Sequence, residues 1–328
     1  MSDVDNATRA CPLCGNENAR TIATMRAEQI VNSSPYYSDS SYDRLLVEAH
    51  DRFGVSQCQR CDFAFASNVP SDDFLSRLYG GHGNSNSDLE ASVGVFARPD
   101  RAAYAFRALS RLLQVIAQTT TVDSMGATNG PIRILDVGCA YAVGSLGLIQ
   151  HHYPYEVVGV EVSEATRNYL ANQGMTSYAQ LCDVPPDTVF DGILLNDVLE
   201  HVATPLDFVR QLKRLSDEQT AIWVNVPNFI DWRLAKIVEQ VNSGSMDVPT
   251  DFNPWEHLSY FSPQSLDAVM NTIGARRLLE RPVEYPVTCD SIVELLQTWL
   301  RATRDVWRIY ARTYPQNFST SGIFVFST

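Results

Sequence analysis

The sequence has 328 residues, of which 45% are hydrophobic and 19% are charged. This composition supplies enough apolar side chains for a full core, so general disorder is excluded. No apolar run approaches the roughly 20 residues that a membrane-spanning helix needs. The formal net charge of -13 disfavours nucleic-acid binding, because an acidic chain repels phosphate backbones. We therefore expect a globular protein that binds neither a membrane nor a nucleic acid.

The cysteines indicate a metal site. Their number, seven, is odd, and the first residues show no secretory signal, so we expect a cytoplasmic protein without a disulfide framework. Four of them form two C-x-x-C pairs, Cys11 with Cys14 and Cys58 with Cys61. Two such pairs can complete a tetrahedral zinc site, which would have no open position for catalysis. The sequence predicts a structural Zn²⁺ ion; a redox pair or unrelated buried thiols are the alternatives.

The N-terminal part reads as a small module. We expect residues 1–95 to bind the zinc ion and to form one wall of a substrate pocket. Residues 30–43 are rich in Ser, Tyr and Asp, which predicts an exposed loop. A short capped helix is predicted to end at Tyr79. Residues 96–130 are then predicted to form a helix, with an apolar stripe at helical spacing, and a linker.

From residue 132 onward, short apolar strands alternate with helical segments. This alternation predicts an α/β fold with a parallel sheet that is covered on both faces. The C-terminal part departs from it, with two further strands around a helix. The predicted strands span 132–137, 156–161, 189–195 and 220–226, the predicted helices 143–151, 163–173, 204–215 and 262–274, and the C-terminal part adds strands at 275–286 and 322–328 with a helix near 290–312.

A glycine turn and an acid point to a nucleoside ligand. Gly138 follows the first predicted strand and lets a ligand approach the backbone closely. Glu161 ends the second predicted strand, where a carboxylate can accept hydrogen bonds from both ribose hydroxyls. The G-x-G-x-x-G spacing of dinucleotide folds is missing. An ordinary turn beside a surface glutamate is the alternative, but the joint occurrence of turn and acid favours a nucleoside site.

Four segments then carry a family resemblance: ILDVGCA, VVGVEVSEAT, FDGILLNDVLEHV and WVNVPN. In order and spacing they resemble the motifs of class I S-adenosylmethionine (SAM)-dependent methyltransferases. The resemblance covers residues 130–328 and implies that residues 131–328 form a SAM-binding domain. It also implies a Rossmann-like sheet of seven strands whose last strand is inserted antiparallel, beside the small N-terminal zinc-binding module.

The resemblance also implies which residues bind SAM. Family members often have glycine where Ala140 and Ala142 stand. Alanine at 140 is a mild change, whereas the methyl group of Ala142 is expected to narrow the cleft. Asp136, Gly138 and Ala140 would line the methionine end, Glu161 would hold the ribose, Gln180 or Leu181 would lie near the adenine, Asn196 and Asp197 would border the methyl group, and Val162 would also contact the cofactor.

A narrower resemblance concerns the substrate. The two cysteine pairs, the aromatic residues Phe63 and Phe65, and the later segment EHLSYFS are similar to those of zinc-containing sugar C-methyltransferases. Those enzymes have a further C-terminal domain that this sequence does not show, and a tyrosine where Pro254 stands. The resemblance implies C- or O-methylation of a small molecule. A sugar, a sugar nucleotide or an intermediate of natural-product or glycan biosynthesis would be the acceptor.

Methyl transfer to a hydroxyl or an acidic carbon requires a base. We predict His257 for this role, on a loop over the carboxyl ends of the strands, because an imidazole titrates near neutral pH. A structural role in bonding the backbone is its alternative. His201 is the second candidate, with a structural or cofactor-side role as its alternative. Tyr260 would orient the substrate or assist the base, or else pack in the core.

Two other readings remain open. Arg101, Arg107 and Arg111 on the predicted helix before the sheet would either clamp a diphosphate or form a solvated face. A different class of function is a zinc-bearing scaffold or adaptor with a degenerate Rossmann domain. Binding of SAM would separate the enzyme from the adaptor, and the sequence indicates no oligomeric state.

Overall fold

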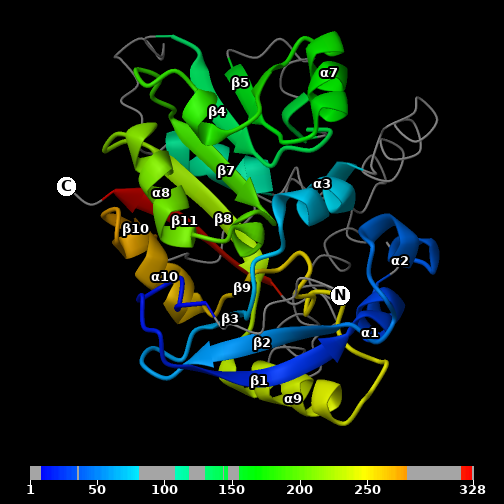
Figure 1. Ribbon diagram of the computed structural model, residues 1–328. Helices are drawn as coiled ribbons and strands as arrows, with labels where there is room; N and C mark the ends of the chain where they lie inside the picture. Colours follow the sequence, from blue (N-terminus) through cyan, green and yellow to red (C-terminus); the bar gives the residue numbers. More distant parts are fainter. Residues whose placement is uncertain are drawn as a thin grey trace, which may run out of the picture.

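The computed structural model describes residues 9–34, 37–80, 108–117, 130–142, 144–146, 155–278 and 319–326. These residues build two β-sheets, one of seven strands and one of four (Figure 1). The two sheets share a hydrophobic core, in which side chains beside the cysteine pairs pack with the strands of the larger sheet. Within the described residues, no helix is long and apolar enough to cross a membrane.

The seven-stranded sheet has the strand order β10-β11-β8-β7-β4-β5-β6. Strands β8, β7, β4, β5 and β6 run parallel, and β11 is inserted antiparallel between β8 and β10. This arrangement confirms the predicted Rossmann-like methyltransferase sheet. Its strands are β4 (Ile132–Val137), β5 (Tyr155–Val160), β6 (Thr176–Tyr178), β7 (Gly192–Asn196), β8 (Ala221–Pro227), β10 (Ala275–Arg277) and β11 (Ser319–Phe326).

The four-stranded sheet is antiparallel and combines distant parts of the chain. Strands β1 (Ala19–Arg26), β2 (Arg52–Cys58) and β3 (Ala64–Ala66) come from the N-terminal part, and β9 (Ser259–Tyr260) pairs with β3. Helix α9 (Asp231–Asn242) packs against β1, as Figure 1 shows at the lower edge of the molecule. The N-terminal module is therefore completed by elements from the methyltransferase part. The predicted domain ranges stay a prediction.

Helices cover both faces of the larger sheet. The helical residues 108–117 pack on one face, and α8 and α10 pack on the other. Side-chain caps explain where two helices begin, because the Ser163 and Ser262 hydroxyls accept hydrogen bonds from backbone amides of the first turn. The helices are α1 (Ala27–Ser33), α2 (Ser40–Leu45), α3 (Asp72–Gly80), α7 (Glu164–Asn172), α8 (Pro205–Arg214), α9 and α10 (Pro263–Asn271), with 3₁₀ turns η1 (Leu181–Asp183) and η2 (Leu199–His201).

The predicted exposed loop at residues 30–43 is wrong in large part. Its first residues continue α1, where Ile30 and Val31 are buried, and its last residues belong to α2. The Ser- and Tyr-rich composition hid these apolar contacts, which form only because the segment packs over the four-stranded sheet. Of the other predicted elements, residues 99–107, 147–151, 279–286 and 290–312 lie outside the described part of the chain.

Candidate active site

The turn after β4 needs glycine. Gly138 has φ +63°, and its backbone amide donates a hydrogen bond to the Val160 carbonyl oxygen over 2.8 Å. A Cβ atom on Gly138 would lie 2.6 Å from a methyl carbon of Val198. Both the backbone angle and this close contact therefore exclude a side chain. The turn brings the ends of β4, β5 and the loop after β7 together.

Glu161 is anchored across this turn. One carboxylate oxygen accepts a hydrogen bond from the Ala140 amide over 3.0 Å, and the other accepts one from the Ser163 amide over 2.8 Å. The structure thus brings together two residues of the predicted cofactor site. The following residue, Val162, is 65% exposed and lies next to this carboxylate in the chain.

Asp136 lies buried at the end of β4 and accepts a hydrogen bond from the Ser145 hydroxyl over 2.5 Å. Burial raises the pKa of its carboxyl group to about 6, the nearby Glu161 charge contributes in the same direction, and the Ser145 hydrogen bond opposes them. Asp136 therefore changes charge close to neutral pH, unlike an ordinary aspartate.

The expectation that Ala142 narrows the cleft is wrong. Its side chain is 4% exposed and packs in the core with Leu146. Ala140 and Ala142 have φ of 44° and 46°, values that glycine adopts more readily than alanine. This left-handed conformation costs a residue with a side chain about 1–2 kcal/mol, so the loop carries strain at both positions.

The loop after β7 holds the residues predicted to border the methyl group. Asn196 ends β7, and Asp197 follows with φ +57°. The Asn225 side-chain amide donates to the Asp197 carboxylate over 2.7 Å, and the Asp197 amide donates to the Asn225 carbonyl oxygen over 2.9 Å. The neighbouring strand β8 therefore fixes the direction of this carboxylate.

The two candidates for the adenine end differ. Gln180 is exposed at the start of η1, whereas Leu181 is 4% exposed and belongs to the core. Of the two side chains, only Gln180 is accessible from solvent.

The two predicted histidines lie side by side. The rings of His201, from η2, and His257, from the segment before β9, are 4.7 Å apart in an edge-to-face arrangement. His257 Nδ1 lies 2.6 Å from the Asp251 carbonyl oxygen. A carbonyl can only accept, so Nδ1 carries the proton and Nε2 presents the lone pair. Burial lowers the pKa of both rings, and their mutual repulsion lowers that of His201 further, so both are neutral at pH 7.

Glu200 joins this pair and was not predicted from the sequence. Its side chain is 1% exposed, and one of its oxygens lies 4.0 Å from His201 Nε2. Burial raises the pKa of its carboxyl group, and the Asp197 charge raises it further. Its place beside His201 in the chain was the available signal, but the sequence does not show that the side chain turns inward. Glu200, His201 and His257 form the histidine cluster.

Arg9 ties the N-terminal module to both histidine segments. Its guanidinium donates hydrogen bonds to the carbonyl oxygens of Ala66, Ala203 and Leu258 over 3.0, 2.8 and 2.7 Å. Leu258 directly follows His257, and Ala203 lies two residues after His201. Arg9 thereby fixes the relative position of two segments that are distant in the chain. No sequence pattern identifies this role.

Tyr260 lies on β9 and is 2% exposed. Its ring packs in the core against Phe229 and Phe252, with both ring centroids 4.9 Å away. This environment fits the packing role that was the alternative to a catalytic role for Tyr260.

The four cysteines of the two C-x-x-C pairs converge. Their sulfur atoms lie within 4.8 Å of one another, with 3.7 Å between the Cys11 and Cys61 sulfurs and 3.6 Å between those of Cys14 and Cys58. The Arg60 amide and the Asn16 side chain both donate toward the Cys58 sulfur. Four convergent thiol groups with supporting N–H donors fit a tetrahedral metal ion.

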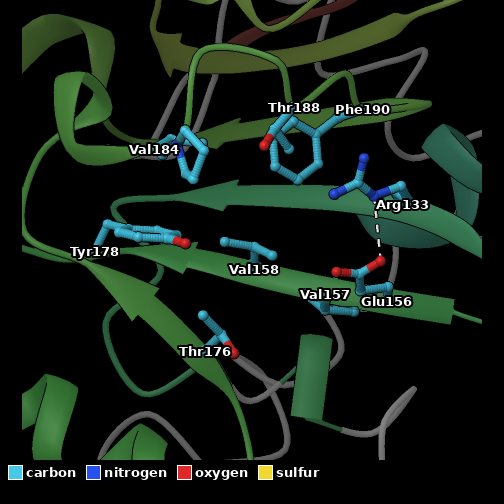
Figure 2. A pocket seen from close by; sticks show the side chains of 10 residues that line it. Arg133, Glu156, Val157, Val158, Thr176, Tyr178, Val184, Thr188 and Phe190 are labelled. Carbon is cyan, nitrogen blue, oxygen red and sulfur yellow. Dashed lines mark hydrogen bonds and ion pairs between the residues drawn. The ribbon is translucent and has the colours of Figure 1, made fainter.

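A cavity of about 290 Å³ lies along β4, β5 and β6 and contains none of the predicted site residues. Figure 2 shows the ion pair between Arg133 and Glu156 at one end and Tyr178 at the other. Of the arginines proposed as a phosphate clamp, Arg101 and Arg107 lie outside the described residues, and Arg111 does not line this cavity, because its guanidinium lies over the ring of Trp223. The structure thus gives this reading no support.

The sheet order and the turn after β4 define a Rossmann-like methyltransferase fold. A family model described as a methyltransferase domain matches residues 101–279, more than half of the sequence. The chain belongs to this methyltransferase family, and it is a SAM-dependent methyltransferase.

The chain is also similar to several solved methyltransferase structures. The magnesium protoporphyrin IX methyltransferase (ChlM) of Synechocystis PCC 6803 with bound SAM is 13% identical, with 79% of this chain and 100% of that chain covered and a TM-score of 0.45. The plantazolicin methyltransferase BpumL is 12% identical, with coverage of 77% and 95% and a TM-score of 0.48. A SAM-dependent methyltransferase from Archaeoglobus fulgidus is 17% identical, with coverage of 66% and 91% and a TM-score of 0.39. No curated protein matches the sequence significantly.

Proposed function

We propose that this enzyme transfers the methyl group of SAM to a small molecule, namely a sugar, a sugar nucleotide or another natural-product intermediate, at oxygen or carbon. The observation that carries the proposal is the paired arrangement of His201 and His257, whose neutral rings lie in the loops that follow β7 and precede β9. The two neutral histidine rings carry no positive charge that would attract a nucleic acid. The net charge of the chain, -13, would repel one.

The cofactor would lie over the turn after β4. Glu161 would exchange its hydrogen bonds with the Ala140 and Ser163 amides, in part, for bonds to the ribose hydroxyls. Asp136 and Gly138 would contact the methionine end, Val162 and Gln180 the adenine side, and Asn196 and Asp197 the methyl group. Leu181 would contribute only through the core beneath the site.

His257 would act as the base through Nε2. The bond from Nδ1–H to the Asp251 carbonyl oxygen fixes the tautomer that this role needs. The acceptor oxygen or carbon attacks the methyl carbon, the carbon–sulfur bond breaks, and S-adenosylhomocysteine leaves with the sulfur lone pair. The acceptor's proton passes to His257. His201 would position the His257 ring through their edge-to-face contact. Tyr260 would hold strand β9 in place through its packing in the core.

The four cysteines would bind Zn²⁺ as a structural ion. Their convergence and the N–H donors to Cys58 support this role. With four protein ligands the ion would stabilise the N-terminal sheet and take no part in the reaction.

Calorimetry with SAM tests the cofactor part of the proposal, and saturable binding is the expected result. A panel of sugar nucleotides and free sugars with methyl-labelled SAM then tests the acceptor class.

Once an acceptor is known, His257→Ala should lower turnover by about 10²–10⁴ with SAM affinity nearly unchanged. His50→Ala is the matched control, because His50 is exposed and lies far from this cluster in the chain. Absence of SAM binding would favour a scaffold or adaptor, and an unchanged turnover would reject His257 as the base.

A further inference from the structure

Glu200 is a buried carboxyl group that has few hydrogen-bond donors. Its side chain is 1% exposed, and among the described residues only its own backbone amide acts on its oxygens as a donor, without the geometry of a full hydrogen bond. Leaving a buried polar group unpaired costs about 1–3 kcal/mol, and more when the group is charged. Such groups in native proteins usually have a ligand or a reaction to serve. The proton transfer to His257 gives Glu200 no direct task, so the carboxyl group requires another explanation.

His257 has the orientation of a metal ligand. It donates from Nδ1 to the Asp251 carbonyl oxygen, which leaves Nε2 for an ion, and the Glu256 backbone raises the pKa of His201, as an acceptor beside that ring does. A histidine that binds a metal ion uses one ring nitrogen for the ion and donates from the other to a carbonyl or carboxylate, which fixes the tautomer. Potential ligand atoms of Glu200, His201 and His257 all lie within 4.8 Å of one another.

Acidic side chains and two arginines, Arg9 and Arg233, lie around this cluster, and Arg9 donates to backbone carbonyl oxygens. Asp197 and Asp251 both act on Glu200 electrostatically. Arg233 compensates Asp251 through two hydrogen bonds of 2.9 and 2.7 Å, and the amide of Asn225, which is neutral, faces Asp197. A divalent cation among these groups would give the Glu200 oxygens a partner, and the Asp197 carboxylate, which faces a neutral amide, would attract it.

We propose that Glu200, His201 and His257 bind a divalent first-row transition-metal ion at the acceptor end of the cleft. Two imidazoles and one carboxylate suit ions such as Zn²⁺, Fe²⁺, Co²⁺ and Ni²⁺. Three protein ligands leave coordination positions open for an acceptor hydroxyl, in contrast to the closed set of four cysteines. The inference rests on the proposed function for its acceptor site. Without the ion His257 Nε2 is the base, and with the ion bound the same atom is a ligand.

The ion would change how the acceptor loses its proton. A hydroxyl group on a divalent cation is more acidic, because the cation stabilises the oxyanion. The O–H bond breaks and the proton passes to water. The oxygen then forms a bond to the methyl carbon of SAM, the carbon–sulfur bond breaks, and the sulfur retains the electron pair. An acceptor that presents a hydroxyl group is therefore the substrate class that this site serves.

Titration of the purified full-length protein with Co²⁺ tests the site without an acceptor or SAM. Cobalt bound by the cysteines gives intense thiolate charge-transfer bands, whereas cobalt bound by imidazole and carboxylate gives weaker visible bands alone. The proposal expects the second spectrum to saturate in the wild-type protein. Glu200→Gln and His257→Ala should lose it, and His50→Ala, which changes an exposed histidine, should keep it.

The variants' thermal unfolding and SAM affinity are measured alongside, so that loss of cobalt is assigned only to folded protein. Glu200→Gln keeps the shape of the side chain and is the variant that decides the outcome if His257→Ala fails to fold. Absence of the imidazole–carboxylate spectrum in the wild type, or its persistence in folded Glu200→Gln, would overturn the metal site. Neither result affects SAM binding, whose absence would instead overturn the proposed function.

Discussion

The side of the site proposed to bind SAM, called the SAM side, and the side proposed to bind the acceptor, called the acceptor side, are built in different ways. On the SAM side, Ala140, Glu161 and Ser163 bond to one another across a single β-α-β segment. On the acceptor side, Arg9 bonds to the carbonyl of Leu258, 249 positions further along the chain. The first side is thus a local structure of the larger sheet, and the second exists only when the N-terminal sheet is complete. Cofactor binding and acceptor chemistry should therefore respond separately to substitutions.

The two sides also differ in chemistry. Backbone amides and a carboxylate prepare the SAM side for a ligand of fixed shape. The acceptor side gathers ionisable groups whose pKa values are shifted by burial, including a buried Glu200 and two neutral histidines. Groups of this kind suit proton transfer or metal binding, and their assembly from distant segments allows the acceptor to vary while the cofactor site stays the same.

The largest effect is expected from the cysteines. Cys58→Ser should abolish zinc binding and unfold the four-stranded sheet, because a structural zinc site contributes about 10 kcal/mol or more, comparable to the whole stability of a domain. Metal analysis together with thermal unfolding measures this change. Cys182→Ser is the control, since Cys182 is exposed and outside the cluster. Equal zinc content and equal melting temperatures in the two variants would argue against a structural metal ion.

Arg9 separates the two sides most directly. Arg9→Met removes three hydrogen bonds from a charged donor, which contribute about 1.5–3 kcal/mol each, although the Leu258 carbonyl oxygen keeps its bond from the Ala66 amide. We expect lower stability and an altered titration of His201 and His257, which NMR of the imidazole signals measures. SAM affinity should stay within a few-fold of the wild-type value. Arg20→Met, at an exposed arginine of β1, is the matched control. Arg9→Lys should restore the titration only in part, since one amine cannot replace the forked guanidinium.

If Arg9→Met left the histidine titration as in the wild type, Arg9 would be a structural residue without influence on the acceptor side. If Arg9→Met abolished SAM binding in folded protein, the SAM side and the acceptor side would not be separable.

Glu161 should affect the SAM side alone. Glu161→Gln removes the charge that would bind the ribose hydroxyls, and hydrogen bonds to a charged group contribute about 1.5–3 kcal/mol. Calorimetry should therefore show SAM affinity reduced about 10- to 100-fold. Zinc content and histidine titration should be unchanged. Glu164→Gln changes an exposed acid in the first turn of α7 and should keep full affinity. Equal affinities in the two variants would remove Glu161 from the cofactor site.

This difference between the sides explains what the sequence could predict. The larger sheet, the turn at Gly138 and the acid at Glu161 follow from short-range patterns: apolar strands, a glycine and a carboxylate at the next strand end. The cysteine convergence follows from C-x-x-C spacing, although 44 positions separate Cys14 from Cys58. Glu200 and Arg9 could not be found in this way, because their roles depend on burial and on contacts between distant segments. The pairing of β9 with β3 could not be predicted either, because it also joins segments that are distant in the chain.

The smallest expected effect is a pH dependence on the SAM side. Asp136 is ionised only above its pKa of about 6, and its carboxylate would attract the positively charged cofactor. SAM affinity should therefore fall as the pH decreases below about 6, by at most tenfold per pH unit. The contribution of Asp136 to the stability of the fold should change in the opposite direction and decrease as the pH rises. Its pKa in the folded protein is raised above the unfolded value, so its protonated form favours folding, and that contribution is lost as the pH rises from about 4 to about 6.

Calorimetry and thermal unfolding between pH 5 and pH 8 measure both trends, and Asp136→Asn is the variant that should remove them. At pH 7 this variant should bind SAM more weakly than the wild type does. Below pH 6 the two proteins should bind SAM with nearly equal affinity. A titration of SAM affinity that persists in Asp136→Asn would assign the pH dependence to another group. Because Ser145 and Glu161 act on Asp136 within the same segment, the effect should also appear unchanged in Arg9→Met, which alters the acceptor side only.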